Sequence, residues 1–172
     1  MGSIERTAAD EQSTYFGTYV AKAQGEDLLN ALSIATQELV TVLELVPTDR
    51  EEFRYAEGKW SIKEVVQHVI DTDRIFCYRA LCFARNDHAE LPGFDENNYV
   101  AHSGADQRTL SSIVGEYKVV HAATLALFSS FRPEDLLRIG TANGSRISVR
   151  ALGWTIAGHC MHHVSILQER YM

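Results

Sequence analysis

Four long stretches of this 172-residue chain place apolar residues three and four positions apart, the spacing of helices that each bury one face. They cover residues 27–46, 61–85, 108–130 and 148–172. Such faces are buried when the helices pack against one another, so we predict an all-α four-helix bundle. With 45% hydrophobic residues, the whole chain, 1–172, is expected to form one domain with its own core.

The segments between these helices are also informative. Residues 14–22 are rich in aromatic residues and predict a short helical arm packed on the bundle. Residues 86–106 contain a Pro-Gly turn signal and predict a long loop, with a helical turn near 95–99. Between residues 137 and 149, an Asn-Gly pair flanked by isoleucines predicts a small hairpin or extended excursion before the last helix.

Two histidines of the last helix lie where a helix normally buries apolar side chains. His159 and His163 are four residues apart, which places them about 40° apart on one helical face. An isolated pair with this spacing can simply pack and form hydrogen bonds. Burying two imidazoles without partners is unfavourable, however, so a shared metal ion is the sharper hypothesis.

A third histidine would complete such a site. His68, at the margin of the apolar face of the second helix, can supply it if the second and fourth helices are neighbours. Three neutral imidazoles suit a divalent ion such as Zn²⁺ or Ni²⁺ and leave one coordination position open. An open position is typical of catalytic sites, where the ion lowers the pKa of a coordinated thiol or water.

Other candidate residues have more than one interpretation. Asp71 can orient a ligand histidine or pair with Arg74 on the surface. Tyr19 and Trp60 can line a pocket, although aromatic packing is the commoner use of such residues. His121 can face the same cavity from the third helix.

Three further histidines are not expected to bind the metal. His162 lies about 100° from His163 on the helix, so we expect it to make a flanking contact or face solvent. His88 and His102 fall in the long loop and are expected to be exposed or to cover the site.

The remaining composition excludes several classes of partner. A net charge of -7 and the lack of a Lys/Arg cluster disfavour nucleic acids and anionic membranes. Residues 1–10 lack the apolar region of a signal peptide. The three cysteines form no C-x-x-C pair, which favours reduced thiols. We therefore expect a cytoplasmic protein.

Four segments resemble one known family, the DinB-like or YfiT-type metal-dependent enzymes. They read KWSIKEVVQHVIDTDR, LPGFD, GTANG and GHCMHHVSILQERY, and the resemblance extends from about Tyr15 to Tyr171. It implies a non-sequential four-helix bundle with a long crossover, often dimeric, so we expect a homodimer. It also implies a metal site, whose three histidines fall on His68, His159 and His163.

The resemblance implies a reaction type only loosely, because some members transfer or isomerise groups with low-molecular-weight thiols and others are presumed hydrolases. We expect a metal-dependent enzyme acting on a small molecule, in which the metal activates a thiol cofactor or water. The alternatives are a non-catalytic, metal-stabilised protein that binds a small ligand or acts in a stress response, and a bundle that holds no metal.

Overall fold

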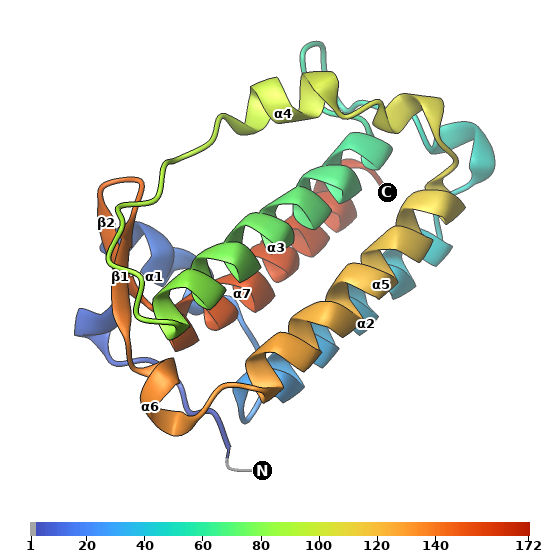
Figure 1. The fold of residues 1–172 in the computed structure, drawn as a ribbon. Coiled ribbons are helices and arrows are strands. Elements are labelled where there is room, and N and C mark those ends of the chain that lie inside the picture. Colours follow the sequence, from blue (N-terminus) through green and yellow to red (C-terminus); the bar gives the residue numbers. More distant parts are fainter. Residues whose placement is uncertain (1–2) are drawn as a thin grey trace.

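The computed structural model describes residues 3–172 and confirms the helical bundle with a hairpin before the last helix. Figure 1 shows the four long helices lying along a common direction. They are α2 (Leu28–Glu44), α3 (Ile62–Ala84), α5 (Leu110–Ser129) and α7 (Val149–Arg170).

The order of the helices in space differs from their order in the chain. Helix α7 packs against α2 and α3, and α5 packs against α3 and α2. Consecutive helices α2 and α3 therefore lie on a diagonal, and the predicted neighbourhood of α3 and α7 is confirmed. This is the non-sequential arrangement that the resemblance implies.

A long crossover joins α3 to α5 because these two neighbours run in the same direction (Figure 1). The 23 residues of α3 span roughly 35 Å, and residues 85–109 must return the chain over that length. The crossover contains α4 (Glu96–His102) and a 3₁₀ turn, η3 (Ala105–Gln107). The predicted helical turn is thus present and slightly longer than expected.

Side-chain caps fix where the long helices begin. Ser61 accepts a hydrogen bond from the Glu64 amide at 3.1 Å, and the Glu64 carboxylate accepts one from the Ser61 amide at 2.8 Å. This is the predicted capping box. The other three helices are capped by short polar side chains that accept a backbone N–H, namely Asp27 in α2, Thr109 in α5 and Ser148 in α7.

A two-stranded hairpin closes one end of the bundle. Strands β1 (Ile139–Ala142) and β2 (Ser145–Ser148) are antiparallel, and Asn143 and Gly144 have φ values of 50° and 69°. Two positive φ values are those of the predicted type I′ turn. The Asn143 amide donates to the Leu91 carbonyl at 2.9 Å, which holds the hairpin tip against the start of the crossover.

Short elements complete the chain. The aromatic arm forms α1 (Thr14–Val20), which packs on α7, and α6 (Pro133–Leu136) leads into the hairpin. Two 3₁₀ turns, η1 (Ala9–Glu11) and η2 (Thr48–Arg50), lie in connecting segments. None of the helices within residues 3–172 combines the length and hydropathy needed to cross a membrane.

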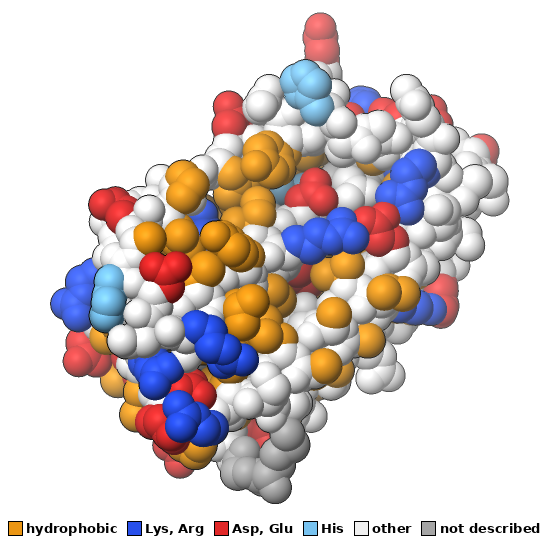
Figure 2. All heavy atoms as spheres, viewed as in Figure 1, with side chains coloured by type: hydrophobic (Ala, Val, Ile, Leu, Met, Phe, Trp, Pro, Cys, Tyr) orange, Lys and Arg blue, Asp and Glu red, His pale blue; other side chains and the backbone are white. Residues whose placement is uncertain are grey.

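The core lies between the four long helices. Trp154 of α7 is its largest fully buried side chain, and its indole N–H donates to the Glu5 carbonyl at 3.0 Å. Figure 2 shows the surface seen in the view of Figure 1. Apolar groups gather there along α3 and the crossover, and charged side chains of both signs surround them. Cys77, Cys82 and Cys160 are free thiols, as predicted.

Candidate metal centre

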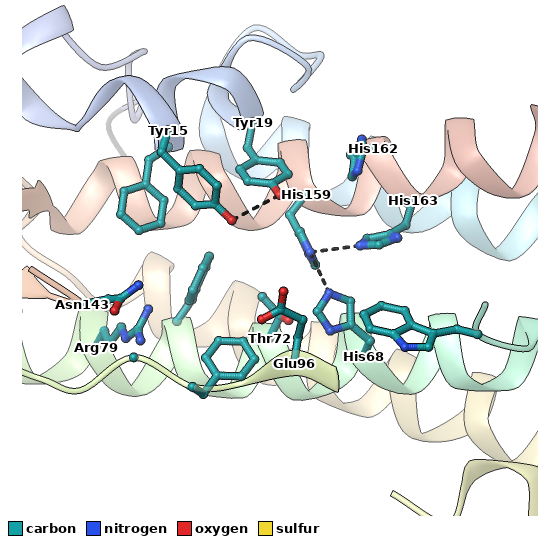
Figure 3. Close-up of a pocket in the computed structure, with 15 residues that line it drawn as sticks. Tyr15, Tyr19, His68, Thr72, Arg79, Glu96, Asn143, His159, His162 and His163 are labelled. Atoms are coloured by element: carbon teal, nitrogen blue, oxygen red, sulfur yellow. Dashed lines mark hydrogen bonds between the residues drawn. The ribbon is translucent and has the colours of Figure 1, made fainter. Parts of the chain in front are cut away.

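Three imidazoles converge between α3 and α7. The Nε2 atom of His159 lies 3.1 Å from Nε2 of His68 and 3.1 Å from Nε2 of His163. The candidate ligand atoms of the three rings all lie within 4.8 Å of one another. His68, expected at the margin of the apolar face, is as buried as the other two histidines. Figure 3 shows His68 reaching up from α3 to meet the pair on α7.

Two aromatic side chains hold these rings in place. The Trp60 indole lies against His68 with 4.8 Å between ring centroids, and the Tyr19 ring lies edge-on to His159 at 5.4 Å. Trp60 comes just before the cap of α3 and Tyr19 comes from α1, so these two segments cover the cluster that α3 and α7 form. Both residues also line the adjacent pocket.

The cluster is electrically neutral near physiological pH. Burial and then repulsion from the nearby His162 together lower the pKa of His68 to about 4. Burial and then repulsion from neighbouring imidazoles hold the pKa values of His159 and His163 well below the ordinary value. Neutral imidazoles have free lone pairs, so little proton release would oppose metal binding here.

Hydrogen bonding alone does not explain this arrangement. A neutral imidazole nitrogen offers either one hydrogen or one lone pair, so Nε2 of His159 can satisfy only one of its two neighbours. The Nδ1 atoms of His159 and His163 are also buried and have no hydrogen-bond partner within residues 3–172. Two nitrogens bound at about 2.05 Å to one tetrahedral ion lie about 3.3 Å apart, close to the separations observed here. The three residues therefore fit a divalent ion.

A pocket of about 230 Å³ opens beside the histidines. It is smaller than the roughly 300 Å³ at which pockets for drug-sized ligands begin, so it suits a small molecule. His162 lines the pocket and is half-buried with its ring beside Tyr19, but it lies outside the three-histidine cluster, as expected. His88 and His102 are exposed.

Two expectations about neighbouring residues need correction. His121 does not line this pocket: it is buried on α5 with its ring 6.3 Å from that of Tyr117, and α5 lies diagonally across the bundle from α7. Asp71 accepts a hydrogen bond from Gln67 and lies 3.8 Å from Arg74. These partners are on the side of α3 that faces α4, so the surface interpretation of Asp71 is supported and the ligand-orienting one is not.

The sequence did not identify four polar residues that line the pocket, namely Thr72, Arg79, Glu96 and Asn143. A signal for Arg79 was present, because it follows His68 by 11 residues, or three helical turns plus about 20°. Glu96 and Asn143 belong to the crossover and the hairpin tip, and no local pattern connects either segment with the histidines.

Comparison with known proteins gives a consistent result. The chain matches the model of the DinB superfamily over residues 31–167. YfiT from Bacillus subtilis, described as a probable metal-dependent hydrolase with an unusual four-helix bundle topology, has a TM-score of 0.68 at 16% identity. The alignment covers 96% of this chain and 93% of YfiT. No curated protein sequence matches the chain.

A second solved structure shares the fold over part of its length. The mycothiol-dependent maleylpyruvate isomerase has a TM-score of 0.66 at 14% identity, and the alignment covers 84% of this chain. It covers 59% of the isomerase chain, so the present chain spans less than two thirds of that protein. At such identities these likenesses establish the fold alone.

Proposed function

This chain belongs to the DinB superfamily, and from that premise we propose that it is a metal-dependent enzyme whose divalent ion is held by His68, His159 and His163. The observation that carries the proposal is the convergence of three buried, neutral imidazole nitrogens on one point beside a pocket. Zn²⁺ and Ni²⁺ are the ions that we propose, because both bind imidazole nitrogen well.

Three protein ligands leave one position for a ligand from the pocket. When bound, the metal would lower the pKa of a thiol or water molecule in that position toward neutrality. Both reaction types have support among the similar structures, since one is described as a probable hydrolase and the other depends on mycothiol. We therefore propose transfer to or from a low-molecular-weight thiol, or hydrolysis.

The surrounding residues would orient and shield the reacting groups. Trp60 and Tyr19 cover two of the ligand rings and keep water from them. Burial and then the Tyr15 hydroxyl at 3.5 Å raise the pKa of Tyr19, so this phenol stays protonated and can donate a hydrogen bond into the pocket. Glu96 is the carboxylate among the pocket-lining residues and can accept a proton there.

Metal analysis of untagged protein is the first test. We expect about one equivalent of Zn²⁺ or Ni²⁺ per chain in the wild type and in His162→Ala, which removes a half-buried histidine outside the cluster. His163→Ala should lose it. Unchanged metal content in His163→Ala, or no metal in the wild type, contradicts the proposal.

Turnover assays separate the enzyme from a non-catalytic metal protein. The wild type and the His68→Ala variant would be compared for thiol transfer, with bacillithiol, mycothiol and glutathione as donors, and for ester and amide hydrolysis. We expect turnover in one class that His68→Ala abolishes. Stoichiometric metal that raises the melting temperature, with no turnover in either class, would favour the ligand-binding alternative.

A further inference from the structure

A cationic side chain is buried in the wall of the same pocket without a counter-ion. Arg79 is only 3% exposed and lines the pocket. The pKa of its guanidinium is lowered by burial, and no carboxylate of the described residues acts on it in the opposite direction. Buried arginines are almost always paired, because removing a charge from water is costly. Arg79 therefore needs an explanation.

The contacts that Arg79 does make use only part of its hydrogen-bonding capacity. One terminal N–H group donates to the Pro92 carbonyl at 2.8 Å, and the guanidinium lies 5.3 Å from the centre of the Phe76 ring. A guanidinium carries five N–H donors in a planar fork. The Pro92 bond leaves donors of this fork available to a ligand in the pocket.

The position of Arg79 relative to the histidines defines the shape of a ligand. Arg79 and His68 lie on the same face of α3, with backbone positions roughly 16 Å apart along the helix axis. Thr72 and Phe76 line the pocket between them. Figure 3 shows Arg79 beside Asn143 at one end of the pocket and the histidines toward the other, with Glu96 on the histidine side. A ligand that reaches both ends must be elongated.

We propose that Arg79 binds the carboxylate of an elongated small substrate whose reacting group lies at the three histidines. The planar fork of a guanidinium matches the two oxygens of a carboxylate, and burial strengthens such charge-assisted bonds. Asn143 adds a side-chain amide beside the anion, and Phe76 supplies an apolar wall for the connecting carbons. This assignment names the substrate class for the proposed enzyme and so rests on that function.

The test compares two probes of equal carbon number, hexanoate and hexan-1-ol, by isothermal titration calorimetry. Metal-depleted protein is used together with the protein as purified, so that binding of the carboxylate to the metal is not mistaken for binding to Arg79. The wild type should prefer hexanoate. In Arg79→Met that probe should bind about tenfold more weakly or worse, while hexan-1-ol changes less than twofold. Arg79→Lys, which keeps the charge but loses the fork, should be intermediate.

Several outcomes would overturn the assignment. Equal binding of hexanoate and hexan-1-ol by the wild type does so without any variant. Unchanged hexanoate affinity in Arg79→Met also does so. A lower melting temperature in Arg79→Met with an unaltered preference for hexanoate would mark Arg79 as structural, since replacing an unpaired buried charge by an apolar side chain should be neutral or stabilising.

Failure of this assignment differs from failure of the proposed enzyme. If metal content is normal but the preference for hexanoate does not depend on Arg79, the carboxylate site is excluded and the proposed metal-dependent enzyme is unaffected. A protein that lacks metal but still selects hexanoate through Arg79 contradicts the metal-dependent enzyme and keeps the anion site.

Discussion

Helix α7 carries two buried polar clusters that differ in how their hydrogen bonds are satisfied. At its N-terminus, the Glu11 carboxylate accepts hydrogen bonds from the Ser148 hydroxyl at 2.7 Å, from Arg150 Nε at 2.8 Å and from the Ala8 amide at 2.8 Å. Further along, His159 faces two other imidazoles, and its Nδ1 has no partner among the described residues. We call these the Glu11 cluster and the histidine cluster.

We interpret this difference as one between a structural cluster and a proposed metal-binding one. Opposite charges and matched donors and acceptors let the Glu11 cluster satisfy itself, so it fastens the N-terminal segment to the end of the bundle. The histidine cluster has three like groups that cannot all satisfy one another, so the proposed metal ion would supply the partner that the chain does not. Polar burial of either kind is costly, and we expect only the second kind to be relieved by a ligand.

Metal removal should give the largest effect. A ligand present at about a thousand times its dissociation constant stabilises a folded protein by about 4 kcal/mol, which for a chain of this length raises the melting temperature by roughly 8–16 °C. Chelator-treated protein should therefore melt lower by about this amount in differential scanning calorimetry, and one equivalent of Zn²⁺ should restore it. Identical melting of treated and untreated protein would remove the distinction between the two clusters.

Substitution of Glu11 should give the next effect and should depend on pH. Burial alone would raise the pKa of Glu11, but bonds from Arg150, Ala8 and Ser148 outweigh it and lower the pKa from 4.5 to about 2. A carboxylate with a depressed pKa stabilises the fold above its unfolded value and loses this contribution as pH falls from about 4.5 towards 2. Glu11→Gln should lower the unfolding free energy at pH 7 by about 2–3 kcal/mol.

Urea unfolding at pH 7, 4 and 3 measures this dependence. The gap between the wild type and Glu11→Gln should narrow as the pH falls, while metal content stays unchanged. Glu38→Gln, which removes an exposed carboxylate on α2, serves as the control. A gap of constant size at all three pH values would mean that the charge of Glu11 contributes nothing.

A glycine next to the histidine cluster allows a test with a smaller expected effect, confined to the contact between α1 and α7. A Cβ atom at Gly158 would overlap the Tyr19 carbonyl, so α1 must shift in Gly158→Ala. Steric overlap of this kind costs about 1–3 kcal/mol, and the gain in helix propensity offsets about 1 kcal/mol of it. We expect a net loss of up to about 2 kcal/mol in urea unfolding, together with weaker metal binding because the Tyr19 ring no longer supports His159.

Gly115→Ala is the matched control for this substitution. Gly115 lies on the exposed side of α5, and a Cβ atom there meets nothing within 4 Å. The variant should be more stable by up to about 1 kcal/mol and bind metal normally. Equal effects of the two substitutions would show that the close approach of α1 to α7 is unimportant for the histidine cluster.

Much of the fold could be predicted from the sequence because its signals are local. Helix periodicity, the Ser61 capping box and the Asn143-Gly144 turn all depend on residues within a few positions of one another. The spacing of His159 and His163 places them on one face for the same reason. The family resemblance added the crossover, which no local pattern specifies.

Only the tertiary structure decided which of the predicted residues meet. Four amphipathic helices can pack in several orders, and apolar periodicity favours none of them. The observed order makes α3 a neighbour of α7, which brings His68 to a pair 91 residues away, and it leaves His121 outside the pocket. It also buries Arg79 in the same cavity as the histidines. Which helices are neighbours is determined by the packing of whole faces and by the crossover, whereas local spacing determines only which side chains share a face.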